Sequence, residues 1–249
     1  MAKCVVVVPT YNESENIGKL VDQILALPVP DVEILIVDDN SPDGTGKLAD
    51  ELAVTRAGKV HVMHRAGKQG LGTAYIQGFC WALDHGADLI LQMDADFSHD
   101  PIYIPAMIGT VAANDVVLGS RYVKGGRLDE EWSIFRKLLS WWANRVWVNV
   151  ILRTPVKDST GGFRVWKRET LVGMDLNRVR SNGYIFQVEM TYIATRLGYK
   201  FAEIPIYFKD RKYGTSKMGL RIQIEAALRV FQVYARFHHL TPADRAVGG

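Results

Sequence analysis

The stretch CVVVVPTYNES, residues 4–14, decides the architecture of the chain. Its first half is a continuous run of apolar, mostly β-branched residues, which is typical of a strand buried on both faces of a parallel sheet. The run ends abruptly in a polar turn that contains an aromatic ring and an acid but no glycine. We therefore expect a buried first strand whose carboxyl end opens onto a functional crevice.

Further runs of the same kind follow, separated by segments with the apolar spacing of helices. The strand-like runs cover residues 33–39, 60–64, 88–94, 115–120 and 201–208. The helical patterns fall around 16–25, 73–83, 131–152, 184–197 and 218–238, and residues 121–183 are otherwise less regular. Strands that alternate with helices predict an α/β fold, with a doubly wound, mainly parallel sheet and flanking amphipathic helices.

The overall composition excludes several classes of protein. A net charge of +3 without a Lys/Arg block does not predict nucleic-acid binding, although it suits a protein that handles anions. The two cysteines lie far apart, which argues against a disulfide framework and favours a reducing cytoplasm. We find no signal peptide and no run of apolar residues long enough to span a bilayer, so membrane contact is expected to be peripheral.

Three of the predicted strands end in acidic residues. Glu13 follows the first strand, Asp38–Asp39 the second, and Asp94 and Asp96 the fourth. Because the carboxyl ends of parallel strands meet at one edge, these acids should converge on one crevice. Neighbouring carboxylates repel unless a cation lies between them, and a few oxygen ligands suit Mg²⁺ or Mn²⁺, which also bind phosphates. The DxD motif therefore predicts a metal–diphosphate site, with helix capping as the alternative.

The turn after the first strand argues against an NAD or FAD site, because it lacks the GxGxxG pattern. Tyr11 can stack on a base, and Glu13 and Asp39 can accept hydrogen bonds from a ribose or a base edge. The same segments also suit helix capping and an ordinary turn, and both roles are compatible. The glycines of GKQGLGTA, residues 67–74, fit either a helix N-terminus near a phosphate or close helix–sheet packing.

Taken in order, five segments resemble the inverting family-2 glycosyltransferases, and within them the dolichol- or polyprenol-phosphate mannosyltransferases. The segments are VVVPTYNESENI, EILIVDDNSPDGT, GLGTAYIQGF, MDADFSHDP and GSRYVKGG, and the resemblance covers roughly residues 3–220. It implies a GT-A fold, a nucleotide-sugar donor and a Mg²⁺ or Mn²⁺ ion at the DxD motif. We expect one domain over 1–240, with a nucleotide-sugar-binding half (1–120), an acceptor- and membrane-facing half (121–240) and a flexible tail (241–249).

Carried over by position, the resemblance assigns roles to individual residues. Those expected around the guanosine part of GDP-mannose are Pro9, Tyr11, Glu13, Val37 and Asp39. Those expected at the metal and the diphosphate are Asp94, Ala95 and Asp96. Ser98 is a less suitable metal ligand, because relatives often carry the longer Gln there. Cations expected on the phosphates of donor or acceptor are Arg121 and, in KDRKYGTSKM, Arg211 and Lys217.

The expected acceptor, a polyprenyl or dolichyl monophosphate, is already anionic at neutral pH and needs no general base. One of its oxygens would attack the mannose C1 opposite the leaving GDP, inverting α to β. Catalysis would then depend on positioning and on charge stabilisation by the metal and the cations, Arg121 among them. No catalytic histidine is required, and His99 is expected in a supporting role.

The segment EWSIFRKLLSWWANRVWVNVIL, residues 131–152, contains four of the six tryptophans. An amphipathic helix with tryptophans and basic residues is typical of a segment in the membrane interface, and a core-packed helix is the alternative. A similar stripe over 220–236 also fits a dimer or the domain core. We therefore expect an enzyme on the cytoplasmic face of a membrane, held there by interfacial helices or by a separate membrane subunit.

Three other functions remain open on the sequence alone. The same transfer from UDP-glucose or another UDP-sugar would use the same motifs. Transfer to a hydroxyl would need a carboxylate base, for which Glu189 is the candidate. A non-catalytic nucleotide- or lipid-binding subunit would have little reason to keep both Asp94 and Asp96.

Overall fold

The structure is a computed structural model that describes residues 2–130, 133–183, 185–209 and 220–247. The strands of the main sheet are β1 (Cys4–Thr10), β2 (Val32–Asp38), β3 (Val60–His64), β4 (Leu89–Gln92), β5 (Val116–Ser120), β7 (Arg164–Lys167) and β8 (Phe201–Pro205). They lie in the order β3-β2-β1-β4-β7-β5-β8, and a separate pair is formed by β6 (Arg127–Leu128) and β9 (Tyr207–Phe208). All main-sheet pairings except those of β7 are parallel, as the sequence predicts.

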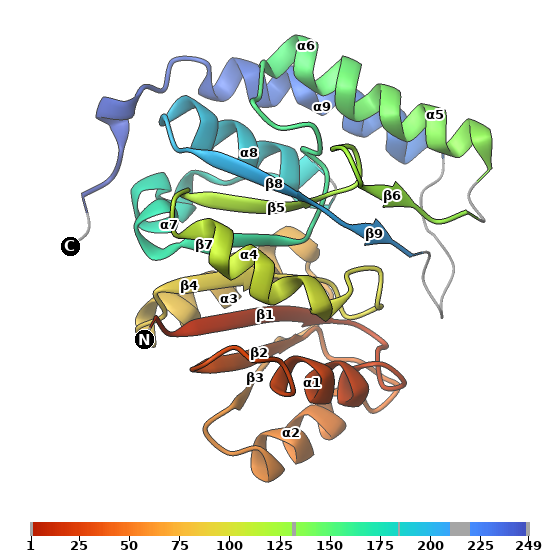
Figure 1. Cartoon of the computed structure of the whole chain (residues 1–249), viewed down its shortest axis with the longest axis vertical. Helices are drawn as coiled ribbons and strands as arrows, with labels where there is room; N and C mark the ends of the chain where they lie inside the picture. Colours follow the sequence, from red (N-terminus) through yellow and green to blue (C-terminus); the bar gives the residue numbers. More distant parts are fainter. Residues whose placement is uncertain (1, 131–132, 184, 210–219, 248–249) are drawn as a thin grey trace.

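Helices lie on both sides of this sheet (Figure 1). They are α1 (Ile17–Leu25), α2 (Thr45–Thr55), α3 (Leu71–Asp84), α4 (Ile104–Val111), α5 (Ile134–Trp142), α6 (Asn149–Leu152), α7 (Arg168–Met174), α8 (Ile185–Arg196) and α9 (Leu220–Phe237). A π-helical stretch, Ala143–Val148, joins α5 to α6, so the amphipathic segment predicted over 131–152 is helical from Ile134 to Leu152.

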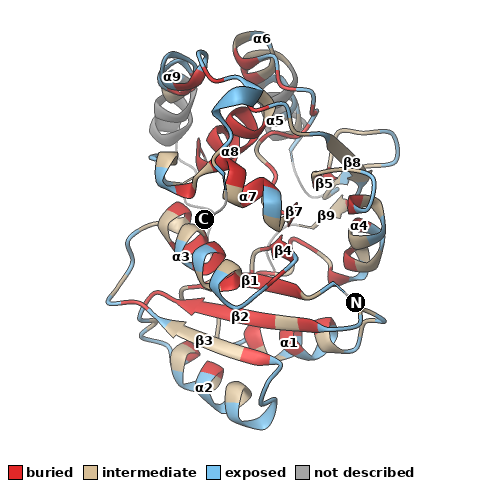
Figure 2. Cartoon of the chain, turned by 90° about the vertical axis from the view of Figure 1, so that its left-hand side faces the viewer, coloured by how far each residue is buried: buried red, intermediate tan, exposed pale blue. Residues whose placement is uncertain are grey.

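The core has two halves because alternate strand residues point to opposite faces of the sheet. Val5 and Val7 of β1 pack with α3 and α8 in one cluster, whereas Val6 and Val8 pack with α1 and α4 in the other. Figure 2 shows the buried residues concentrated in the central strands and in α8. Burial of β1 on both faces explains why its sequence is a continuous apolar run rather than an alternating one.

Strand β7 is the main departure from the predicted topology. It lies between β4 and β5 and runs antiparallel to both, with Arg164 opposite Gln92 on one side and opposite Leu118 on the other. Since β7 runs in the reverse direction, its first residue lies at the edge where β4 ends. The loop before β7 is thereby brought beside the DxD motif, which follows β4.

The C-terminal residues fold back onto the domain after α9. The Arg245 guanidinium donates to the carbonyls of Leu197 and Gly198, just after α8, at 2.8 and 3.0 Å. The Ala246 backbone N–H donates to the Gly173 carbonyl at 2.9 Å. This part of the expected flexible tail is therefore tied to the domain, through bonds to backbone groups that the sequence does not mark. Among the described residues, no helix has the length and apolarity needed to cross a membrane.

Candidate active site

The DxD motif lies directly after β4, where the chain turns sharply. Phe97 adopts a left-handed backbone conformation, with a φ of 61°. Ser98 closes the turn, because its backbone N–H and its hydroxyl donate to Asp96 Oδ1 at 3.0 and 2.6 Å. Asp96 is buried, whereas the Asp94 side chain is 30% exposed. The turn therefore presents Asp94 to the crevice, and the Ser98 hydroxyl, expected as a less suitable metal ligand, is engaged in holding Asp96.

Two groups hold Asp94 in place. The Tyr75 hydroxyl, on α3, donates to Asp94 Oδ1 at 2.9 Å, and the Asp94 backbone N–H donates to His99 Nδ1 at 3.1 Å. Because Nδ1 accepts this bond, the neutral ring of His99 carries its proton on Nε2. Burial lowers the pKa of His99, and the charges of Asp94 and Asp96 only partly oppose that effect. A neutral, buried ring suits the supporting role that the sequence suggests.

Asp39, after β2, faces a basic residue that the sequence analysis did not single out. Arg65, directly after β3, forms a buried ion pair with Asp39 and donates to Thr73 Oγ1 at 2.6 Å. Burial raises the pKa of Asp39, and the Arg65 guanidinium opposes that rise. Arg65 thus fixes the Asp39 carboxylate at the carboxyl edge of the sheet. Its position immediately after a predicted strand is the signal that could have identified it.

Tyr11 and Glu13 lie at the same edge and are partly exposed. The ammonium of Lys68 lies 4.1 Å from the centroid of the Tyr11 ring, a cation–π contact. Glu13 Oε2 accepts a hydrogen bond from Asn16 Nδ2 at 2.8 Å. The turn after β1 therefore gathers an aromatic ring, a carboxylate and a cation, which are groups able to bind a base, a ribose hydroxyl and a phosphate.

Val37, which is expected beside the guanosine, lies in the core of the domain. It lies opposite Pro9 in the β1–β2 register and is fully buried in the core cluster that includes α3. A methyl group added at Gly78 of α3 would lie 3.3 Å from its side chain. Because Val37 points into the core, it supports the strand and has no exposed surface for a nucleotide. Ala95 is likewise almost fully buried, whereas Pro9 is partly exposed.

Arg121, after β5, is held by an acid that is distant in the sequence. Its Nε and Nη2 donate to the two carboxylate oxygens of Asp158 at 2.8 and 2.6 Å, and Nη2 also donates to Thr160 Oγ1 at 2.8 Å. Burial alone would raise the pKa of Asp158, but the Arg121 guanidinium lowers it below its usual value. Of the three cations expected on phosphates, Arg211 and Lys217 lie outside the described residues.

The loop over residues 158–162, which we call the DSTGG loop, joins Arg121 to the DxD motif. At its other end, a methyl group added to Gly162 would lie 3.6 Å from Asp94 Oδ2 and 3.2 Å from His99 Cε1. The fully buried Arg164 guanidinium braces the loop by donating to the carbonyls of Ser159 and Gly161, both at 2.8 Å. The sequence signal for this loop is an acid next to small residues and two glycines.

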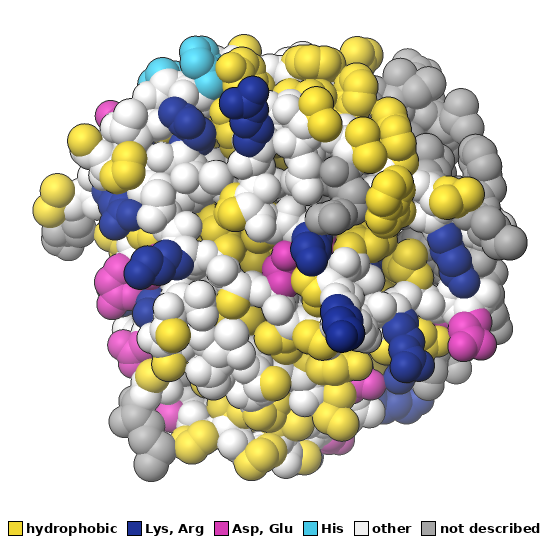
Figure 3. All heavy atoms as spheres, turned by 45° about the horizontal axis from the view of Figure 1, so that its top comes forward, with side chains coloured by type: hydrophobic (Ala, Val, Ile, Leu, Met, Phe, Trp, Pro, Cys, Tyr) yellow, Lys and Arg dark blue, Asp and Glu magenta, His cyan; other side chains and the backbone are white. Residues whose placement is uncertain are grey.

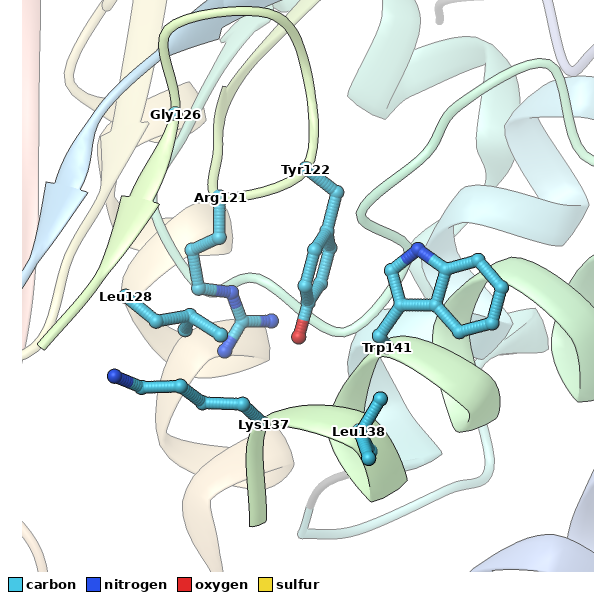
Figure 4. A pocket seen from close by; sticks show the side chains of 7 residues that line it. All are labelled: Arg121, Tyr122, Gly126, Leu128, Lys137, Leu138 and Trp141. Carbon is cyan, nitrogen blue, oxygen red and sulfur yellow. The ribbon is translucent and has the colours of Figure 1, made fainter. Parts of the chain in front are cut away.

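A cavity of about 410 Å³ opens beside Arg121. Its lining residues are Arg121, Tyr122, Gly126, Leu128, Lys137, Leu138 and Trp141 (Figure 4). Tyr122 is fixed by its hydroxyl, which lies 2.6 Å from Ser140 Oγ on α5. Leu138 and Trp141, also on α5, are 60% and 47% exposed. The cavity therefore combines two cations with an apolar rim, a lining that fits an amphiphilic anion.

Glu189, the candidate base for a hydroxyl acceptor, is fully buried on α8. Its carboxylate accepts the Ser181 backbone N–H at 2.6 Å and lies 3.3 Å from Arg236 Nη1 on α9. The carboxylate is therefore engaged in joining the loop before α8 to α9. This structural role does not support its assignment as a general base.

The acids after β4 suit a hard divalent cation. Mg²⁺ usually takes one or two protein carboxylates and completes its octahedral shell with waters and substrate phosphates. Asp94 and Asp96 supply two carboxylates. Within the described ranges, no cluster of three or more His, Cys, Asp or Glu side chains forms a metal site. The residues present thus fit an ion that is bound together with a diphosphate rather than by the protein alone.

Comparisons with known proteins connect this geometry to a family. Residues 5–173 match the family described as Glycosyl transferase family 2. The chain is 43% identical to the undecaprenyl-phosphate mannosyltransferase of Micrococcus luteus over 231 residues, which cover 90% of both chains. It is 44% identical to the polyprenol monophosphomannose synthase of Mycolicibacterium smegmatis over 218 residues, covering 87% of this chain and 81% of that one.

A more distant solved structure has the same fold. The glucosyl-3-phosphoglycerate synthase from Mycobacterium tuberculosis, in complex with Mn²⁺, uridine-diphosphate and phosphoglyceric acid, matches with a TM-score of 0.67 and 17% identity. The match covers 94% of this chain and 78% of that chain. Together with the seven-stranded sheet, this likeness confirms the predicted GT-A-like fold. The resemblance read from the sequence is confirmed as well, and the chain belongs to the family-2 glycosyltransferases.

Proposed function

We propose that this enzyme transfers mannose from GDP-mannose to a polyprenyl, dolichyl-type monophosphate with inversion, giving polyprenyl phosphate β-mannose and GDP. The observation that carries the proposal is the DSTGG loop, which joins Asp94 to the cavity containing Arg121 and Lys137. A lipid monophosphate is an amphiphilic anion of the kind that this cavity suits. The names of the two curated relatives describe enzymes of the same class.

Each part of the site has a place in this reaction. Tyr11, Glu13 and Asp39 would bind the nucleoside, since they supply a ring and two carboxylates at one edge of the sheet. Asp94 and Asp96 would hold a Mg²⁺ or Mn²⁺ ion on the diphosphate. When bound, such an ion neutralises negative charge on the leaving group.

Arg121 and Lys137 would hold the acceptor phosphate. The Asp158 carboxylate fixes the Arg121 guanidinium through two bonds, so its orientation is set before the substrate arrives. A phosphate monoester is anionic at neutral pH and attacks without a general base. This agrees with a site in which Glu189 is committed to backbone bonds and His99 is neutral and buried. The chain's own contribution is then to align the attacking oxygen with C1 opposite the leaving diphosphate.

The same transfer from a UDP-sugar is the second candidate. It is favoured only by the motifs that both donors share, because the uridine-diphosphate-bound neighbour is too distant in sequence to carry its ligand to this chain. Both curated relatives, at more than 40% identity, have names that specify mannose. GDP-mannose is therefore the donor that we propose.

Parallel transfer assays test the function. The purified protein is incubated with Mg²⁺ or Mn²⁺, a short polyprenyl phosphate and labelled GDP-mannose or UDP-glucose, and label is counted in the organic phase. We expect label only from GDP-mannose, only with a metal, and as a β-mannosyl phosphate by NMR. Label from UDP-glucose alone would mean that the donor is UDP-glucose rather than GDP-mannose. The absence of transfer from either donor would contradict the proposed reaction.

We also propose that α5, α6 and α9 seat the enzyme on the lipid surface that contains its acceptor. Figure 3 shows hydrophobic side chains gathered on this face of the molecule, with Lys and Arg side chains among them. Among the side chains of these helices whose burial the structure describes, the large exposed apolar ones are Leu138, Trp141, Trp142, Val150, Leu228, Phe231 and Tyr234. α9 packs against α6, and the Trp147 ring contacts both Trp142 and Phe231. The apolar residues of these helices therefore adjoin one another, and Leu138 and Trp141 also line the cavity. Exposed aromatic and basic residues on such helices are typical of an interfacial surface.

Removing apolar surface from this patch should weaken membrane binding without affecting chemistry. Val150 and Leu228 are 70% and 61% exposed and do not line the cavity. In the double variant Val150→Ser/Leu228→Ser, we expect the fraction bound to phosphatidylglycerol-containing vesicles in a flotation assay to fall by about tenfold or more, since each lost side chain removes about 1 kcal/mol of burial. Transfer to a short, water-soluble acceptor should stay near normal.

The matched control is Val54→Ser. Val54 is 79% exposed on α2, at the opposite end of the molecule from α5 and α9 (Figure 1). It should bind vesicles like the unsubstituted enzyme. Equal vesicle binding by all three proteins would show that another surface of the protein makes the contact, and no binding by the unsubstituted enzyme would indicate that a separate membrane subunit is needed.

A further inference from the structure

Tyr75 is a polar side chain in an otherwise apolar place. It lies on α3 and is fully buried, and its ring stacks on those of Phe79 and Phe186, with ring centroids 5.7 and 6.0 Å away. Core positions of this kind are ordinarily satisfied by phenylalanine, because burying a hydroxyl costs free energy unless it is hydrogen-bonded. Here the hydroxyl has a partner, and that partner is Asp94 Oδ1 at 2.9 Å.

This bond limits how the Asp94 carboxylate can be oriented. The backbone N–H of Asp94 is fixed by His99 Nδ1, and Oδ1 is fixed by the Tyr75 hydroxyl. The other oxygen, Oδ2, lies on the side of the DSTGG loop, near Gly162. The carboxylate is thus anchored at the backbone and at one oxygen, which sets the direction of the second.

The position of the Tyr75 hydroxyl is fixed by the packing of its ring. The rings of Phe79 and Phe186 stack on the Tyr75 ring, so the hydroxyl at its end is held beside the Asp94 carboxylate and donates to it.

We propose that Tyr75 is a positioning residue for metal binding, whose hydroxyl holds Asp94 so that Oδ2 points to the divalent cation and the diphosphate. The inference rests on the proposed function, since it assumes that Asp94 holds an ion together with a nucleotide. Hydrogen-bond partners of metal-binding carboxylates orient them, and their removal typically weakens metal binding by about 10- to 100-fold.

The test is the variant Tyr75→Phe, which removes one oxygen atom and keeps the ring. Binding of Mn²⁺ is measured by electron paramagnetic resonance in the presence of GDP and without acceptor, so that no turnover is involved. We expect the Mn²⁺ dissociation constant to rise about tenfold or more. Transfer by the same variant should need correspondingly more Mn²⁺ for half-saturation and recover most of its rate at saturating metal.

The matched control is Tyr192→Phe. Tyr192 is a buried tyrosine on α8 in the same core cluster, and its ring stacks on Tyr234. Thermal unfolding of both variants shows whether each is folded. Tyr192→Phe should leave Mn²⁺ binding unchanged.

The outcomes separate this inference from the proposed function. Equal Mn²⁺ affinity in Tyr75→Phe and the unsubstituted enzyme would show that Tyr75 only packs in the core and does not position Asp94. The metal site itself would not be contradicted. Failure of the unsubstituted enzyme to bind Mn²⁺ with GDP would overturn the metal site and, with it, the role of Tyr75. A lower unfolding temperature with normal Mn²⁺ affinity would likewise reject positioning in favour of simple packing.

Discussion

Replacing Asp96 by alanine should reduce transfer by about a thousandfold or more, even at saturating metal. Asp94 and Asp96 are the two carboxylates of the candidate metal site, and a bound cation contributes several kcal/mol of transition-state stabilisation. A loss of about 4 kcal/mol corresponds to a factor of about a thousand in rate. The measurement is single-turnover transfer of labelled mannose over a range of Mn²⁺ concentrations.

The fold should survive this change. The Asp96 carboxylate accepts bonds from the backbone N–H and the hydroxyl of Ser98, only two residues away, and the loss of these bonds is local. We expect a cost of about 1–2 kcal/mol in the free energy of unfolding, measured by urea denaturation. A larger loss of stability would mean that the lost activity cannot be assigned to the metal site.

Asp100 provides a matched acid for comparison. It lies four residues further along, where its carboxylate accepts the Ile102 backbone N–H at 3.1 Å and pairs with Lys209 at 3.1 Å. Asp100→Ala removes the same charge from the same loop but leaves both acids of the DxD motif. We expect turnover within about threefold of normal, since the change removes a helix cap and a partly exposed ion pair with Lys209 but no group of the DxD motif. Comparable losses in Asp96→Ala and Asp100→Ala would contradict the metal assignment.

The part of the fold that could be predicted from the sequence is the part that local patterns determine. The runs at 4–8, 33–39 and 115–120 are largely apolar because their strands are buried on both faces. Strand β7 is only RVWK, with a charged residue at each end, and its burial depends on β4 and β5 on either side. Its place and direction are therefore properties of the sheet rather than of those four residues.

The candidate site also has one part that could be predicted from the sequence and one part that could not. The DxD motif and the polar turn after β1 are contiguous in the sequence, so their residue types could be interpreted directly. Arg121 and Asp158 are 37 residues apart, and Arg65 and Asp39 are 26 apart. Such pairs form only when the fold brings distant strand ends together. The burial of Val37 was not predicted, because its position near the end of β2 does not show that the core covers the strand on both faces there.

The second large effect is expected at Asp158. Its carboxylate is fully buried and binds the Arg121 guanidinium through both oxygens. Removing one member of a buried ion pair leaves the other charge without compensation, which typically costs about 3–5 kcal/mol. We therefore expect Asp158→Asn to lower the free energy of unfolding by an amount of that order. Transfer should also be strongly reduced, because Arg121 loses the contact that orients it toward the acceptor phosphate.

The pH dependence of stability gives this prediction a specific signature. Arg121 holds the pKa of Asp158 below its usual value in the folded protein, despite burial, which acts in the opposite direction. A lowered folded-state pKa stabilises the protein fully above the unfolded-state pKa of about 4 and progressively less as the pH falls through the folded-state value. The difference in unfolding free energy between the unsubstituted enzyme and Asp158→Asn should therefore be constant near neutral pH and shrink below about pH 4.

A double variant shows whether the loss of stability comes from the interaction between Arg121 and Asp158. Arg121→Met removes the cation, and Arg121→Met/Asp158→Asn removes both charges. If the two side chains act through each other, the double variant should be less destabilised than the sum of the single variants, by about 1–3 kcal/mol. Urea denaturation of the four proteins at several pH values supplies both measurements. Additive losses that do not change with pH would mean that Asp158 stabilises the loop by packing alone, and Arg121 would then need another explanation for its fixed position.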